Sequence, residues 1–142
     1  RHEKLKLMNE VFGTIELICG GKADIAYVTQ EMLEKTGARM DETDGIIEML
    51  RNISGVEISA FLKETKPGEV KVGLRAKTYG YVSAIAQEFG GGGHRKAAGC
   101  TLNTSLEDAK RKISAAISAH LSKTELAGGE ETGAGNGAYD KK

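Results

Sequence analysis

The chain has 142 residues, of which 39% are hydrophobic, and its 20 basic side chains balance 20 acidic ones, so the formal net charge is zero. This length and apolar content suit one hydrophobic core and are too small for two catalytic domains of ordinary size. The neutral balance argues against a general polyanion binder. Residues 63–96 nevertheless contain seven basic and three acidic side chains, a local balance of +4. We therefore expect one domain with one positive region.

The chain carries no sign of secretion or membrane insertion. Its two cysteines, Cys19 and Cys100, are far apart and form no metal-like pair, which favours a reduced cytoplasmic setting. No apolar run approaches the roughly 20 residues that cross a bilayer, and residues 1–10 lack a signal-peptide core. The chain opens on Arg1, directly in a helix-like segment, so we expect it to be a fragment of a longer protein.

The N-terminal two thirds predict two hairpins and two helices. Runs rich in β-type residues predict strands at residues 11–17, 24–28, 56–62 and 69–75. Gly20-Gly21 supplies the first turn and Lys66-Pro67-Gly68 the second. Between the hairpins, Thr29 is expected to cap a helix that ends at Gly37, and Asp44 to cap a helix over residues 46–53.

The C-terminal third predicts a helix at residues 82–89, a glycine-rich loop, a short strand at 98–102 and a long helix at 105–121. These elements predict an α/β domain of the α+β kind, with a mixed sheet of about five strands built from two hairpins and a short strand, and with helices packed on it. We expect the domain to span residues 1–126 and a flexible Gly-rich tail to follow at 127–142.

The most informative segment is residues 90–99, Gly-Gly-Gly-Gly-His-Arg-Lys-Ala-Ala-Gly. Glycines adopt positive φ without a Cβ penalty, so successive N–H groups of such a loop can converge on one anion. The next three side chains add donors and positive charge. The segment matches neither the P-loop pattern nor the dinucleotide-binding fingerprint. A phosphate-bearing ligand is the first hypothesis, and a helix end that runs into a plain surface loop is the alternative.

Two further side chains bear on this hypothesis. Arg75 ends an alternating strand, where its guanidinium could hold a phosphate through two parallel hydrogen bonds, although an exposed cation on an edge strand explains it as well. His94 directly follows the glycines and suits binding to a phosphate oxygen, stacking on a base or proton transfer. A lone histidine is more often a polar surface residue, but its position favours binding.

The sequence offers no catalytic centre of its own. His2, His94 and His120 stand alone, without the spacing that gathers ligands around a metal ion. Ser83 and Ser105 lie in no nucleophile-elbow sequence and have no evident base. We therefore expect this chain to bind no metal and to hold no catalytic residue.

Four motifs in order resemble a known family: Asp41-Glu42-Thr43-Asp44-Gly45-Ile46, Gly55-Val56-Glu57-Ile58, Val70-Lys71-Val72-Gly73-Leu74-Arg75-Ala76-Lys77 and Phe89-Gly90-Gly91-Gly92-Gly93-His94-Arg95-Lys96-Ala97-Ala98-Gly99-Cys100. Together they resemble the C-terminal DHH-associated domain of DHH-family phosphoesterases, over about residues 3–121. Within that family the chain looks most like bacterial oligoribonucleases that also remove phosphate from adenosine 3′,5′-bisphosphate.

The resemblance implies a division of labour. In this family an N-terminal DHH domain holds two manganese ions, and the C-terminal domain closes over the cleft and grips the nucleotide. It implies that this chain, which lacks the DHH half and would be inactive alone, holds a phosphate-bearing nucleotide or short single-stranded RNA. The implied substrate-binding residues are Arg75, Gly91, Gly92, Gly93, His94, Arg95, Lys96 and Ala97. Ala76 departs from the family, where many relatives have serine, so ligand affinity could differ.

Other functions stay open at this point. Related phosphoesterases that cleave cyclic dinucleotides or longer single strands use a similar glycine loop. A non-catalytic RNA-binding module, like the related domain of alanyl-tRNA synthetases, is an alternative of another class, and a domain whose loop binds nothing is a third. The rings near the loop are few, Tyr79, Tyr81 and Phe89, which favours short nucleotides over long strands held on several stacking platforms.

Overall fold

Six strands form one mixed sheet in the order β1-β2-β3-β4-β6-β5, so the predicted α/β single-domain fold is confirmed. The strands are β1 (Glu16–Ile18), β2 (Ala23–Val28), β3 (Ile58–Lys66), β4 (Glu69–Ala76), β5 (Gly92–His94) and β6 (Ala97–Leu102). The β2–β3 pair is parallel and the other neighbouring pairs are antiparallel. The helices are α1 (His2–Phe12), α2 (Gln30–Thr36), α3 (Ile46–Arg51), α4 (Val82–Gln87) and α5 (Leu106–Gly133), with 3-10 turns η1 (Cys19–Gly21) and η2 (Met40–Thr43).

The computed structural model describes residues 2–133, and it describes side chains for residues 2–124. Helix α5 continues to Gly133, beyond the predicted end at Leu121. Most of the tail predicted at 127–142 lies outside the described residues, and its flexibility stays a prediction. Among the described helices, none combines the length and apolar composition that a membrane span requires.

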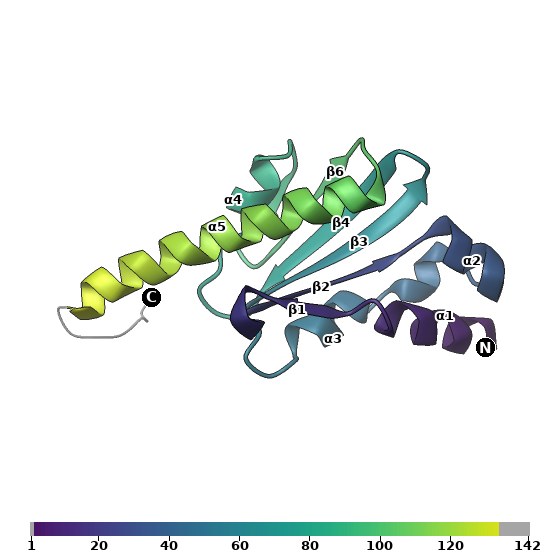
Figure 1. The fold of residues 1–142 in the computed structure, drawn as a ribbon, viewed down its shortest axis with the longest axis horizontal. Coiled ribbons are helices and arrows are strands. Elements are labelled where there is room, and N and C mark those ends of the chain that lie inside the picture. Colours follow the sequence, from purple (N-terminus) through teal and green to yellow (C-terminus); the bar gives the residue numbers. More distant parts are fainter. Residues whose placement is uncertain (1, 134–142) are drawn as a thin grey trace.

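Helices cover the two faces of the sheet unequally. On one face α4 and α5 close a large core over β3, β4 and β6, and Figure 1 shows α5 running across this face. On the other face α1, α2 and α3 close a smaller core over β2 and β3, around Leu7, Val11, Leu50 and Phe61. The sheet therefore has one fully covered face and one partly covered face.

Several local predictions are confirmed. The Thr29 hydroxyl accepts a hydrogen bond from the Met32 N–H at 3.0 Å, so it caps α2 as predicted. Gly37 ends that helix with φ 76°, a left-handed conformation that glycine adopts without strain. Both hairpins form, β1–β2 and β3–β4.

Three local predictions are wrong. Val11 belongs to α1 rather than to the first strand, because it is fully buried in the smaller core. Asp44 does not cap α3: Gly45, with φ 94°, occupies that position and no side chain caps the helix. Residues 92–94 form the short edge strand β5, the sixth strand of the sheet, rather than a loop.

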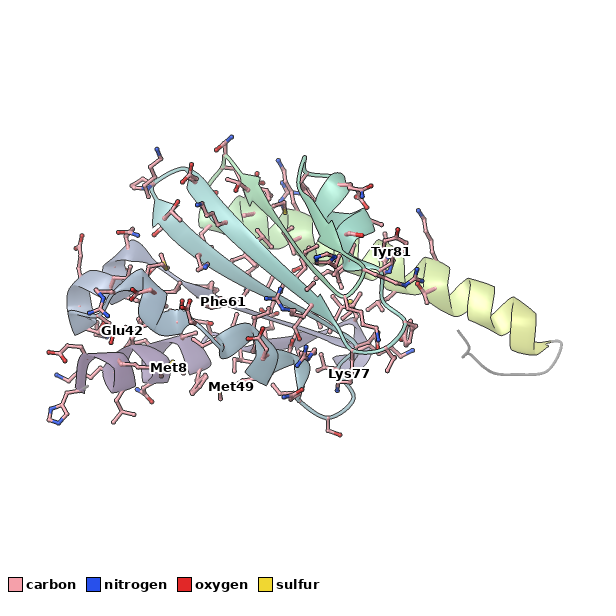
Figure 2. The ribbon with its side chains drawn as sticks, turned by 180° about the vertical axis from the view of Figure 1, so that it is seen from behind. Met8, Glu42, Met49, Phe61, Lys77 and Tyr81 are labelled. Carbon is pink, nitrogen blue, oxygen red and sulfur yellow. The ribbon has the colours of Figure 1, made fainter. Side chains whose placement is uncertain are left out.

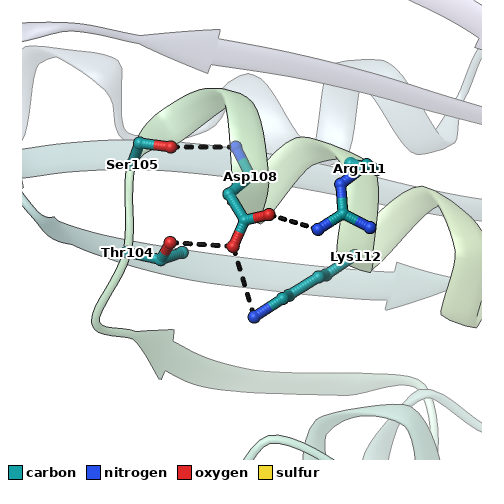
Figure 3. A network of polar contacts seen from close by, with 5 residues as sticks. All are labelled: Thr104, Ser105, Asp108, Arg111 and Lys112. Carbon is teal, nitrogen blue, oxygen red and sulfur yellow. Dashed lines mark hydrogen bonds and ion pairs between the residues drawn. The ribbon is translucent and has the colours of Figure 1, made fainter.

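The start of α5 is fixed by polar contacts, which Figure 3 shows. The Asp108 N–H donates to the Ser105 hydroxyl at 3.1 Å, so Ser105 caps the N-terminus of this helix. The Asp108 carboxylate accepts from the Thr104 hydroxyl at 2.8 Å and pairs with Arg111 and Lys112. These contacts, with Thr104 contributing most, hold the pKa of Asp108 down to about 2. The carboxylate therefore stays charged near the positive end of the helix dipole.

Candidate functional site

On the second sheet face, α3 reaches β4 through the Glu48–Arg75 pair, whereas α1 and α2 pack over β2 and β3. Along β4, the even-numbered residues face the core under α4 and α5, and successive strand residues alternate between faces. The odd-numbered residues of β4 and β6 therefore lie on the opposite face, beyond the reach of α1 and α2. Figure 2, seen from behind, shows β3 and β4 in front of α5 on this side. We call this surface the bare half-face; its residues are Lys71, Gly73, Arg75, Ala97, Gly99 and Thr101.

Three glycines form a row across the bare half-face. Gly73 of β4 lies opposite Gly99 of β6, and Gly99 lies opposite Gly92 of β5. A Cβ added to Gly92 would meet nothing within 4 Å, and one added to Gly73 would only touch the Phe61 carbonyl at 4.0 Å. Packing thus does not require glycine at Gly73 or Gly92. Glycine inside a strand weakens it and often marks a place where a ligand or another backbone approaches closely.

Arg75 lies beside this glycine row and is held in place. Its Nε donates to the Glu48 carboxylate at 3.3 Å and its Nη1 donates to the Leu74 carbonyl at 2.9 Å. The Arg75 side chain is 26% exposed. It lines a hollow of about 300 Å³ together with Glu48, Gly45 and Gly73. These two hydrogen bonds therefore fix the orientation of the guanidinium. Part of the guanidinium faces the hollow, where its remaining N–H donors could bind a phosphate.

The glycine segment is shaped by packing against β6. A Cβ on Gly91 would lie 2.1 Å from the Gly99 carbonyl oxygen, and one on Gly93 would lie 2.7 Å from the Ala97 carbonyl oxygen. The Gly91 N–H donates to the Ala86 carbonyl at 2.9 Å. The predicted convergence of successive N–H groups on one anion is therefore wrong for Gly91. Close backbone contact explains the glycines at 91 and 93, and the positive φ of 80° explains Gly90. Within residues 90–93 this leaves Gly92 as the glycine that neither packing nor φ requires.

The structure separates the cationic residues that follow the glycines. His94 pairs with Ala97, and Ala97 pairs with Arg75, so all three share one level of the sheet and one face. Arg95 and Lys96 form the exposed turn between β5 and β6. Arg75, Gly92, His94 and Ala97 thus come together, whereas the Arg95 guanidinium turns elsewhere.

Arg95 belongs to a cluster beside α5. Its guanidinium carbon lies 4.4 Å from the centre of the Tyr81 ring, a cation–π contact. The Tyr81 N–H donates to His120 Nε2 at 3.0 Å, so this nitrogen of His120 is unprotonated. Burial is the main cause that lowers the pKa of His120. Figure 2 places Tyr81 next to α5. Arg95 therefore stabilises the start of α4 rather than joining Arg75.

A buried carboxylate shapes the loop after β4. Glu57 is 6% exposed, and its Oε2 accepts hydrogen bonds from the N–H groups of Thr78, Tyr79 and Gly80 at 2.7–2.9 Å. Its Oε1 accepts from the Thr78 hydroxyl at 2.7 Å. A carboxylate with this many donors fixes the backbone that leads from Arg75 to α4.

Sequence reasoning missed Glu48, Glu57 and Gly73 as residues of the site. The Arg75–Glu48 contact spans 27 residues of sequence and the Glu57 contacts span 21 to 23, so no local pattern reveals them. Gly73 did carry a signal: the period-two alternation of residues 69–75 places it between Lys71 and Arg75 on one face.

Manganese, which the family resemblance implies for the DHH half, finds no donor set here. Among the described side chains, no three His, Cys, Asp or Glu residues cluster closely enough to hold a metal ion. His94 lies on the bare half-face level with Arg75, a cation, rather than with a carboxylate. No chemical step of this chain is therefore assigned to a metal.

Comparison with known proteins identifies the family. Residues 24–123 match the DHHA1 domain family, so the chain belongs to it. The bifunctional oligoribonuclease and PAP phosphatase NrnA of Thermus thermophilus is 36% identical over 121 residues, covering 83% of this chain and 35% of the relative. The Bacillus subtilis protein of the same name is 29% identical over 98 residues, 69% of this chain and 30% of its own length. The chain thus spans about a third of the curated relatives it matches.

Solved structures share the fold. An exopolyphosphatase-related protein from Bacteroides fragilis superimposes with a TM-score of 0.80 at 23% identity, over 88% of this chain and 37% of that protein. The pGpG-specific phosphodiesterase PggH from Vibrio gives a TM-score of 0.59 at 18% identity, over 85% of this chain and 39% of that one. At these identities the likeness concerns the fold alone.

Proposed function

We propose that this domain binds the phosphate and terminal nucleotide of the substrate of a DHH-family phosphoesterase. The substrates would be short oligoribonucleotides, adenosine 3′,5′-bisphosphate or both. The names of the curated relatives support this substrate class. In this proposal an N-terminal DHH domain of the same protein carries the manganese and cleaves, and this chain alone is inactive.

The observation that carries the proposal is the setting of Arg75. Glu48 and the Leu74 carbonyl fix the guanidinium, and the hollow beside it opens on the bare half-face. A guanidinium held before the ligand arrives loses little freedom on binding, so more of the phosphate contact appears as affinity. Gly73 and Gly92 leave room beside it for the sugar and base, and His94 lies level with it across β6.

Orientation is the contribution of this domain to the reaction. Hydrolysis at a metal centre requires the scissile phosphate to lie within reach of the activated water, and a clamp on the far end of a short substrate supplies that alignment. A site that holds one terminal phosphate also sets how much of the chain extends toward the metals. The proposal therefore assigns substrate length, rather than bond cleavage, to this chain.

The test is a titration of the 142-residue chain, followed by NMR at the amides of residues 90–99 and the Arg75 side chain. Adenosine 3′,5′-bisphosphate, a linear diribonucleotide and a cyclic dinucleotide are compared. We expect Arg75→Ala to weaken binding of the bisphosphate at least tenfold, about 1.4 kcal/mol, because a charge-assisted hydrogen bond is lost. The control is Arg111→Ala, which removes an equally charged, ion-paired arginine from α5.

Each outcome bears on the proposal. Weaker binding for Arg75→Ala and unchanged binding for Arg111→Ala support it. Equal affinities of wild type and Arg75→Ala for all three ligands would overturn it. A preference for the cyclic ligand would move the substrate class to cyclic dinucleotides and leave the role of Arg75 standing. In the longer protein, the same variant should lower kcat/KM.

A further inference from the structure

Two lysines face each other across the β3–β4 hairpin without a carboxylate between them. Lys63 of β3 and Lys71 of β4 are directly opposite in the antiparallel register. Both lie on the same face as Gly73 and Arg75, because all are odd-numbered positions of paired strands. Like charges directly opposite each other destabilise a strand pair. The Lys63–Lys71 pair therefore destabilises the β3–β4 hairpin, and the packing of the fold does not require lysine at either position.

The acidic side chains of β3 and β4 have other partners, and Glu48, which lines the Arg75 hollow with Lys63, pairs with Arg75. Glu64 accepts a hydrogen bond from the Gln30 N–H at 2.9 Å, and Glu69 accepts from the Thr65 hydroxyl. Within the part of the chain that the structure describes, Lys63 and Lys71 make no ion pair or side-chain hydrogen bond. Their two ammonium groups therefore remain available to an anion from solution.

The two lysines line a hollow that adjoins the one at Arg75. This second hollow, of about 490 Å³, is bounded by Lys63, Lys71, Gly73, Gly99 and the glycine segment at Gly91. Lys63 and Gly73 also line the 300 Å³ hollow at Arg75. Since both hollows share these two residues and Gly73 has no side chain, a ligand can pass from one to the other over the glycine row.

The distance between Lys71 and Arg75 indicates what kind of ligand could contact both side chains. Lys71 and Arg75 are four residues apart on β4, which is about 13 Å along an extended strand. A ligand that contacts both therefore extends along the strand and carries more than one anionic group. A linear nucleotide chain fits this description, because it has a phosphate at every step.

We propose that Lys63 and Lys71 form a second anion subsite, which binds a phosphodiester of a linear oligonucleotide whose terminal phosphate lies at Arg75. This inference rests on the function proposed above and narrows it: the bare half-face then favours linear di- and trinucleotides over a nucleoside bisphosphate. Between the two subsites the sugar–phosphate chain crosses the glycine row at Gly73.

The test compares two ligands on the 142-residue chain, a 5′-phosphorylated triribonucleotide and adenosine 3′,5′-bisphosphate, at several salt concentrations. We expect the double variant Lys63→Gln/Lys71→Gln to weaken trinucleotide binding at least fivefold at low salt. The slope of log affinity against log salt should fall by about 0.7, because the neutralisation of one phosphate of a single strand is lost. Affinity for the bisphosphate should stay within twofold.

The control variant is Lys4→Gln/Lys6→Gln, which removes the same charge from exposed positions of α1. Unchanged trinucleotide affinity in the Lys63/Lys71 variant overturns the inference. Equal losses in the test and control variants also overturn it, because they indicate a general charge effect. If Arg75→Ala weakens both ligands while the lysine variant weakens neither, the proposed function stands and the second subsite alone fails. If wild type binds neither ligand, both fail.

Discussion

The two halves of the second sheet face differ in the side chains that their strands present. Over β2 and β3, apolar residues such as Val28 and Phe61 pack under Leu50 and the first helix. Over β4 and β6, the same face carries cations and glycines, which cannot form a core. The strand alternation continues unchanged from one half to the other. The strand sequence itself therefore disfavours a hydrophobic core over β4 and β6, where α3 makes a polar contact through Glu48 and Arg75.

A substitution in the core of the covered half should have the largest effect on the free energy of unfolding. Leu50 of α3 is 1% exposed, so Leu50→Ala leaves a cavity and should lower the free energy of unfolding by about 2–5 kcal/mol. The neighbouring Met49 is 51% exposed, and Met49→Ala should change it by less than about 0.5 kcal/mol. Urea unfolding followed by circular dichroism measures both. Similar losses in the two variants would contradict a helix α3 that buries Leu50 against the sheet and exposes Met49 to solvent.

The covered half also contains one buried carboxyl group without a hydrogen-bond partner. Asp24 is fully buried on β2, opposite Ser59, and no hydrogen bond of good geometry reaches either of its carboxylate oxygens. Burial raises the pKa of Asp24 from 3.8 to about 6, although the nearby Ser59 hydroxyl and the charge of Lys77 oppose the rise. The charged form is thus disfavoured in the folded state.

This shift predicts a pH dependence with a definite sign. Well below pH 3.8 Asp24 is protonated in both the folded and unfolded states and costs nothing. Between pH 3.8 and about 6 the unfolded state ionises and folding must take a proton back, and above about 6 folding must accept a buried charge. Two pKa units correspond to about 3 kcal/mol. Asp24→Asn should therefore be more stable than wild type by up to about 3 kcal/mol at pH 7.5, and the difference should approach zero by about pH 3, below the ordinary pKa of 3.8. Urea unfolding at both pH values measures it; a difference independent of pH would contradict the assignment.

A substitution on the bare half-face should change nucleotide affinity more than the stability of the fold. Gly92→Ala adds a methyl group to open space at a residue without positive φ, so stability should change by less than about 1 kcal/mol. Nucleotide affinity should fall several-fold because the methyl group enters the glycine row. Gly91→Ala is the matched control: its Cβ would overlap the Gly99 backbone, so it should lose about 1–3 kcal/mol of stability. Thermal unfolding and ligand titration of both variants decide this; full affinity in a folded Gly92→Ala protein would argue against a ligand there.

Elements with local signals were predictable. Thr29 and Gly37 bound α2 as expected, because a cap and a left-handed glycine act within a few residues. Pro67 and Gly68 placed the turn between β3 and β4 for the same reason. Of the candidate site, the alternation around Arg75 correctly put it near the end of a strand, and the short strand predicted after the glycine segment forms as β6, beside β4.

Elements decided by distant contacts were not predictable. Val11 has β propensity but lies in a helix, since burial against the sheet outweighs a weak local preference. Gly92 to His94 form a strand because β6 pairs with them, although glycine disfavours strands. The ligand contact of Arg95 stays a prediction, and only the tertiary structure shows that its guanidinium lies over the Tyr81 ring.

By itself, the sequence determined the alternation of buried and open positions along β4, the turn between β3 and β4, the caps of α2 and the family, because each depends on residues close together in the chain or on an ordered motif. The tertiary structure alone decided which strands are neighbours and which half of the second face stays bare. It therefore decided that Glu48 orients Arg75, and that Lys63 faces Lys71 beside a row of glycines. Those arrangements depend on contacts between segments far apart in sequence, whose geometry is set only when the whole sheet assembles.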